Sequence, residues 1–150
     1  MLLFGLFSFF KRFQPQTVYL QGWGDFTSES TGYWCGKATF GPLGQQIDLA
    51  INSPDEPPGM DAVNFYRKIE SCWTQLWASM RETLFAEVDN FSTGATPEEL
   101  FDSLHVDGFE FWSLVEAEES WEITCTTPLD HHVFGIEMAG WVEQGFRMDG

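Results

Sequence analysis

One segment with a helical period, residues 60–91, constrains most strongly what this chain can fold into. Apolar residues recur there at spacings of three and four, which predicts an amphipathic helix with one broad apolar stripe. The stripe comprises Tyr66, Ile69, Trp73, Leu76, Met80, Leu84, Val88 and Phe91, widened by Phe65, Trp77 and Phe85. Proline and glycine at 57–59 precede the segment and Gly94 follows it, as expected at helix ends. A stripe this rich in aromatic residues needs a large apolar partner, so we expect the helix to pack on a β-sheet.

The segments on either side of this helix alternate with a period of two, which predicts strands. We expect three strands before the helix, at 17–23, 31–40 and 45–52, and four after it, at 109–116, 120–127, 132–138 and 141–150. Between them, Thr96, Pro97 and Glu99 form a helix-opening signature for a short helix that ends at Leu104. The predicted fold is therefore α+β. About seven strands form an antiparallel sheet or sheets in two meanders, three strands then four, with one long and one short helix between them packed on one face.

The first residues differ in composition from the rest, and we expect an apolar N-terminal arm over residues 1–16 and a single α+β domain over 17–150. The apolar run Leu2 to Phe10 is far shorter than the roughly 20 residues that cross a bilayer. Lys11 and Arg12 follow this run, whereas a secretory signal places its positive charge first. We therefore expect neither a membrane span nor a signal peptide. The arm either docks on the domain or makes weak contact with a membrane surface through Leu2 to Phe13.

The chain is strongly acidic, with a formal net charge of -16 and only 7 Lys and Arg among its 150 residues. The charge is uneven, because 16 of the 23 acidic residues lie from Glu82 onward, where Arg147 is the only Lys or Arg. Such a charge repels the phosphates of nucleic acid and favours a basic protein or a cation as partner. The three cysteines are odd in number and widely spaced, which indicates unpaired thiols in a cytoplasmic protein.

Few residues suggest catalysis. Candidate metal ligands are His105, Asp130, His131 and His132, which would support a metal-dependent hydrolase. However, adjacent residues in a strand point to opposite faces, so His131 and His132 are poorly placed to share one metal ion. Neither a nucleophile elbow nor a phosphate-binding glycine loop is present, and no cofactor is expected.

The last strands contain, in order, an aromatic strand, a Pro-Asp-His turn, a Phe-Gly-hydrophobic-Glu strand and a final Asp-Gly. The residues concerned are Trp121, Pro128, Asp130, His132, Phe134, Gly135, Glu137, Asp149 and Gly150. In this pattern the chain resembles a loose group of small, acidic bacterial proteins built from a domain of unknown function. Some of these proteins are regarded as immunity proteins of polymorphic toxin systems. The resemblance implies protein binding and supplies no catalytic residues.

Together, charge and resemblance predict a non-catalytic protein-binding domain that neutralises a basic toxin by occlusion. The candidate binding residues are the aromatic anchors Trp112 and Trp141 and the acidic residues Glu116, Glu118, Glu119 and Glu122. Two alternatives remain open at this point. One is the metal-dependent hydrolase, and the other is a peripheral membrane accessory protein that uses the N-terminal arm as its anchor.

Overall fold

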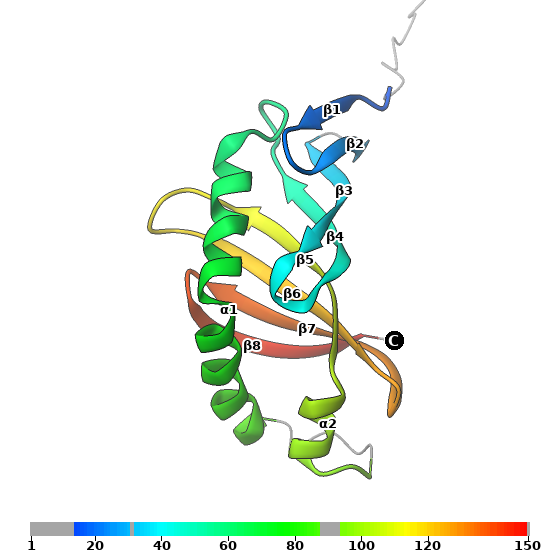
Figure 1. Cartoon of the computed structure of the whole chain (residues 1–150), viewed down its shortest axis with the longest axis vertical. Coiled ribbons are helices and arrows are strands. Elements are labelled where there is room, and N and C mark those ends of the chain that lie inside the picture. Colours follow the sequence, from blue (N-terminus) through cyan, green and yellow to red (C-terminus); the bar gives the residue numbers. More distant parts are fainter. Residues whose placement is uncertain (1–13, 31, 88–93, 150) are drawn as a thin grey trace, which may run out of the picture.

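A computed structural model describes residues 14–30, 32–87 and 94–149 as one α+β unit (Figure 1). The elements in chain order are β1 (Thr17–Leu20), β2 (Gly24–Ser30), β3 (Tyr33–Phe40), a 3-10 helix η1 (Gly41–Leu43), β4 (Gln45–Asn52), α1 (Met60–Glu87), α2 (Pro97–Ser103), β5 (His105–Ser113), β6 (Ser120–Thr127), β7 (Asp130–Ala139) and β8 (Val142–Asp149). All eight strands belong to one sheet, whose spatial order is the order of the chain from β1 to β8. The helix α1 crosses in front of the sheet in Figure 1.

The sheet is mixed because of the helical connection at its centre. β4 and β5 pair in parallel, whereas every other neighbouring pair is antiparallel. Antiparallel neighbours need only a tight turn, but parallel neighbours need a long crossover, and here α1 and α2 supply it. The crossover carries the chain over one face of the sheet, so α1 joins two four-stranded meanders into a single layer.

The expected α+β class, the two meanders, the long helix and the strands after it are confirmed, and the structure differs in two details. The sheet has eight strands where about seven were expected, and β2 is the strand that was not predicted. The sheet is also not antiparallel throughout, because β4 and β5 run in the same direction. In β2 only Phe26 is apolar and buried, so its alternation was too weak to recognise. Gly22 lies in the turn from β1 into β2 and Gly24 is the first residue of β2, and their φ values are +88° and +104°.

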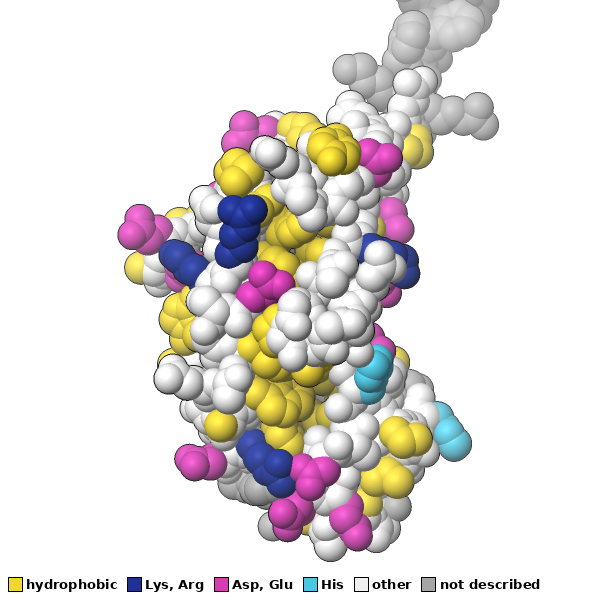
Figure 2. Space-filling model, in the orientation of Figure 1, with side chains coloured by type: hydrophobic (Ala, Val, Ile, Leu, Met, Phe, Trp, Pro, Cys, Tyr) yellow, Lys and Arg dark blue, Asp and Glu magenta, His cyan; other side chains and the backbone are white. Residues whose placement is uncertain are grey.

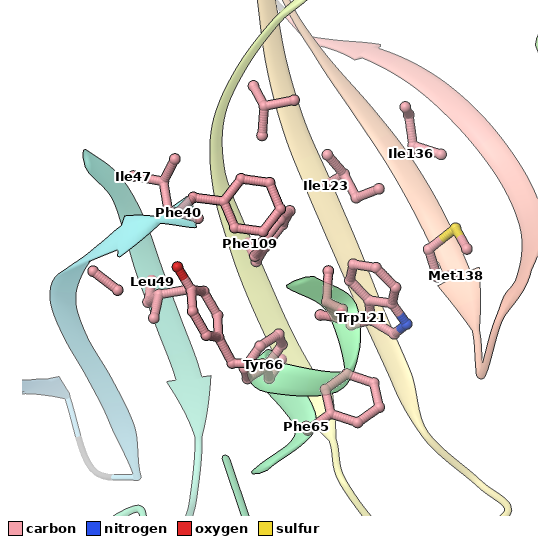
Figure 3. Close-up of a cluster of buried hydrophobic side chains, with 14 of the residues drawn as sticks. Phe40, Ile47, Leu49, Phe65, Tyr66, Phe109, Trp121, Ile123, Ile136 and Met138 are labelled. Carbon is pink, nitrogen blue, oxygen red and sulfur yellow. The ribbon is translucent and has the colours of Figure 1, made fainter. Parts of the chain in front are cut away.

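The core lies between α1 and the sheet and is rich in aromatic residues (Figure 3). Tyr66 points from α1 towards Phe40 and Phe109, with ring centroids 6.0 and 6.2 Å away. One position earlier on the helix, Phe65 meets Trp121 edge to face at 5.8 Å. Edge-to-face pairs of this kind add stabilisation beyond the area they bury. The helical stripe therefore packs as expected from Phe65 to Met80. Its remaining members, Leu84, Phe85, Val88 and Phe91, have side chains outside the part of the chain that the structure describes.

The short helix begins where the sequence indicates. The Thr96 hydroxyl accepts a hydrogen bond from the Glu99 amide (3.2 Å), and the Glu99 carboxylate accepts one from the Thr96 amide (2.9 Å). This reciprocal capping box satisfies two amides that a helix start leaves unpaired. Phe101 is buried and packs at 4.8 Å from the Trp77 ring, which attaches α2 to α1.

The expected N-terminal arm falls mostly outside the described residues, which begin at Gln14. Gln16, which was assigned to the arm, already pairs with the sheet, because the Ser28 amide donates a hydrogen bond to the Gln16 carbonyl oxygen at 2.8 Å. Within the described part of the chain, neither helix is long and apolar enough to cross a membrane.

The turn between β5 and β6 contains a residue in a costly backbone conformation. Ala117 has a φ of +65°, and the non-glycine residues described include no other with positive φ. A left-handed conformation costs an L-residue roughly 1–2 kcal/mol, and glycine escapes this cost. We therefore expect Ala117→Gly to raise the free energy of unfolding by about 1 kcal/mol in urea denaturation followed by tryptophan fluorescence.

Gly140, with a φ of +56° and open space around it, is the matched control for this prediction. Gly140→Ala should lower the free energy of unfolding by about the same amount. A loss of stability in Ala117→Gly would contradict the backbone assigned to this turn.

Candidate functional site: the open face of the sheet

The eight-stranded sheet has two faces of different chemistry. Directly opposite residues on neighbouring strands share a face, so the strand register assigns each side chain to one of them. The row Trp34, Ile51, Phe111, Trp121 and Met138 faces α1 and is buried. The opposite face carries a row that runs across the whole sheet, and we call it the open face. That row comprises Thr17, Thr27, Cys35, Ala50, Glu110, Glu122, Glu137 and Gly145.

Carboxylates dominate the open face. Glu110, Glu122 and Glu137 are direct neighbours on β5, β6 and β7. A parallel row brings Lys37 beside Asp48 at one end and carries Arg147 on β8 at the other. Like charges directly opposite one another destabilise a sheet unless something compensates them. A row of three glutamates is therefore an arrangement that needs an explanation.

Arg147 supplies part of the compensation. Its Nε and Nη2 atoms donate to the two carboxylate oxygens of Glu122 at 2.8 and 2.6 Å, so the contact is bidentate. The same guanidinium also pairs with Asp149 and lies 3.9 Å from a Glu137 oxygen. The Glu122 side chain is only 2% exposed, against 43% for Arg147. A buried carboxylate is tolerated when it is paired and hydrogen-bonded, and Arg147 meets both conditions.

Gly135 makes room for this carboxylate. A Cβ atom at Gly135 would lie 2.8 Å from the Glu122 carboxyl carbon, closer than a real contact allows. The position needs glycine because the Glu122 side chain lies against the β7 backbone. The glycine in the Phe-Gly-hydrophobic-Glu pattern of β7 thus has a physical cause, because it leaves room for the Glu122 carboxylate.

A hollow of about 460 Å³ lies on the open face beside the glutamate row. Its lining residues are Glu29, Cys35, Gly36, Lys37, Asp48, Leu49, Ala50, Asp107, Gly108, Phe109 and Thr124. The floor is formed by small residues and backbone, and acidic side chains stand around it. Lys37 lies at the rim, where its ammonium is 3.1 Å from Asp48. A space of this size accommodates one or two side chains of another segment.

Two groups on the open face, Tyr33 and Cys35, have a raised pKa, and burial is the main cause in both. Burial, together with the charge and hydrogen bonding of Glu29, raises the pKa of the Cys35 thiol to about 11. Burial also raises the pKa of Tyr33, reinforced by a hydrogen bond to Glu110 and by its charge. Both shifts disfavour an anion at these positions. Cys35 is therefore a poor nucleophile at neutral pH.

The sequence-predicted binding residues do not form one surface. Glu122 is on the open face but buried under Arg147. Trp141 lies on the α1 side, where its ring stacks on Phe65 at a centroid distance of 5.3 Å, and it is 42% exposed. Trp112 is half-buried, and its carbonyl oxygen accepts a hydrogen bond from Asn52. The remaining candidates, Glu116, Glu118 and Glu119, lie in the turn between β5 and β6.

The predicted metal ligands lie near the starts of β5 and β7. His105 approaches Asp107 at 3.8 Å, and His132 contacts Asp130, whose carboxylate also accepts the His132 amide at 2.9 Å. These hydrogen bonds lower the pKa of the Asp130 carboxyl. His131 is exposed. In residues 14–30, 32–87 and 94–149, no three His, Cys, Asp or Glu side chains are grouped so as to hold a metal ion.

Of the charged residues on the open face, only Glu122 was among the predicted binding residues. The residues that the sequence did not indicate are Glu29, Asp48, Asp107, Glu110, Glu137 and Arg147. A usable signal was present in the alternation of each strand. Glu110 lies between Phe109 and Phe111, and Glu137 lies between Ile136 and Met138, so both had to face away from the core. That Glu110, Glu122 and Glu137 are neighbours depends on strand order and register, which the alternation does not contain.

The Glu122–Arg147 pair yields a stability prediction. Arg147→Met leaves the buried Glu122 carboxylate without its guanidinium and should lower the free energy of unfolding by about 2–4 kcal/mol, since breaking a buried pair is costly. Adding Glu122→Gln should restore part of the loss, because a neutral amide costs less to bury than a carboxylate. Urea denaturation of the two variants measures both effects.

Arg81 provides the control, because its ion pair with Asp102 at 2.6 Å involves a carboxylate that is 55% exposed. Exposed pairs contribute at most about 1 kcal/mol, so Arg81→Met should cost far less than Arg147→Met. Equal losses in the two variants would show that the Glu122–Arg147 pair has no special role.

The chain was compared with protein-family models, with curated proteins and with solved structures. None of the three comparisons finds a significant match. Its function is therefore inferred from the residues of the open face.

Proposed function

We propose that the protein is a cytoplasmic, non-catalytic binding domain that neutralises a basic protein, such as a toxin, by covering its cationic surface with the open face. The observation that carries this proposal is the glutamate row Glu110, Glu122 and Glu137 beside the acidic hollow. The resemblance to immunity proteins points in the same direction. Occlusion requires binding alone, so the protein needs no catalytic group of its own.

The charge distribution gives the open face its preference for cations. Among the described residues, no Lys or Arg forms an ion pair with Glu29 or Glu110. Lys37 and Arg147 are the basic residues of this face, and both pair with carboxylates of the same face. A surface with excess carboxylates accelerates encounters with a positive partner and repels acidic ones and nucleic acid.

The α1 side is a poorer candidate for such a partner. The described part of α1 carries the bases Arg67, Lys68 and Arg81. It also carries Asp61, Glu70 and Glu82, and Figure 2 shows basic and acidic side chains interspersed on this side of the molecule. Mixed charges give no strong field of either sign.

The test is capture of a partner from source-cell lysate at low salt, followed by titration with the purified captured protein. We expect a basic protein whose affinity falls steeply as salt rises, because the interaction is electrostatic. Glu110→Gln with Glu137→Gln should weaken binding at least about tenfold, a loss of about 1.4 kcal/mol. Purified toxin activity should be blocked at a one-to-one ratio.

A matched pair of exposed acids separates the open face from total charge. Glu56→Gln with Glu82→Gln removes the same charge from the chain elsewhere and should leave the affinity nearly unchanged. A third double variant, Glu116→Gln with Glu118→Gln, tests the turn between β5 and β6. Equal weakening by all three double variants, or binding that does not depend on salt, would contradict the proposal.

A further inference from the structure

Two hairpin turns lie side by side at one end of the sheet. The Gly140 amide in the β7–β8 turn donates a hydrogen bond to the Glu119 carbonyl oxygen in the β5–β6 turn at 2.7 Å, and both turns project past α1 on the same side in Figure 1. Val115 and Val142 at these turns are 60% and 64% exposed, whereas most large apolar residues of the described chain are buried. The two turns therefore present apolar surface that the core does not use.

Another hollow, of about 390 Å³, lies beside these turns on the α1 side. It is lined by one side of α1, from Lys68 to Ser79, and by Trp141 of the β7–β8 turn. We call this hollow, together with Val115 and Val142, the hairpin patch. An exposed apolar patch with a polar border is typical of a protein–protein interface.

Charges of both signs border the hairpin patch. Arg67 and Lys68 on α1 are exposed, and among the described residues they are the only Lys or Arg that form no ion pair. Glu116 and Glu118 in the β5–β6 turn are also exposed, and no described Lys or Arg pairs with them. Because the chain has 23 acidic residues and 7 basic ones, two adjacent bases without a carboxylate partner point to an acid on another molecule.

A second copy of the chain fits this patch. A two-fold dimer joins the same surface of two chains, so that surface must complement itself. The hairpin patch does so, because it has bases on α1, acids on the β5–β6 turn and apolar surface with an aromatic ring between the two turns and the helix. The open face does not, because two copies of an acidic surface repel each other.

We propose that the protein forms a two-fold symmetric homodimer through the hairpin patch. The α1 bases Arg67 and Lys68 of each chain pair with the β5–β6 turn of the other, and the Trp141 rings meet near the axis. The dimer leaves the glutamate row uncovered, so each chain keeps its own open face. It requires no basic partner and is independent of the function proposed above.

Sedimentation velocity of the full chain tests for the dimer over a concentration range of about 1–200 μM, because the population of a dimer depends on protomer concentration. We expect a species of twice the chain mass that dissociates on dilution. R67E/K68E places acids opposite acids at both contacts, and E116K/E118K places bases opposite bases. Each variant alone should associate at least about tenfold more weakly than the unmodified chain, although the second lowers the net negative charge.

Mixing the two variants tests the pairing itself. A heterodimer of R67E/K68E with E116K/E118K restores opposite charges at both contacts and has the same total charge as the original dimer. The mixture should therefore dimerise at concentrations where neither variant does so alone, a result that unfolding of a variant cannot produce.

The matched control is D25K/E82K, which changes the charge by the same amount as E116K/E118K at exposed positions away from the patch and should remain dimeric. An unmodified chain that stays monomeric throughout the range would overturn the inference. So would a dimer that survives both charge reversals, or a mixture of the variants that stays monomeric.

Discussion

The structure depends on one constraint: a single long helix covers one face of an eight-stranded sheet. Aromatic residues of α1, above all Phe65 and Tyr66, pack against the strands from one side. The strands turn one set of alternate residues towards the core and the other set towards the open face. The residues that point away from α1 do not contribute to the core, so they determine the chemistry of the open face. Several of these residues are glutamate or aspartate.

This arrangement has a structural cost, which the chain meets with two specific residues. Three glutamates in register would repel one another, yet Glu122 is held by a bidentate bond from Arg147, and Gly135 leaves space for it. The neighbouring Glu110 and Glu137 are only partly buried.

Most elements could be predicted from the sequence, whereas the site could not. The helical stripe, the capping box at Thr96 and the alternation in β4 depend on local spacing, and the structure confirms them. The strand β2 was missed because Phe26 alone marks its buried side. The parallel pairing of β4 with β5 joins segments far apart in the sequence, such as Asp48 and Gly108, and the alignment of the glutamates depends on the register of two successive hairpins. The alternation within a single strand records neither.

Carboxylate footprinting with a cationic probe tests the central claim most directly. An acetylated oligo-arginine is a suitable probe, because its guanidinium groups do not couple to activated carboxylates. If the open face is the cation-binding surface, the probe should slow the labelling of Asp48, Glu110 and Glu137 and leave that of Glu56 and Glu82 unchanged. Uniform protection of all exposed acids, or protection concentrated on Glu56 and Glu82, would contradict the account.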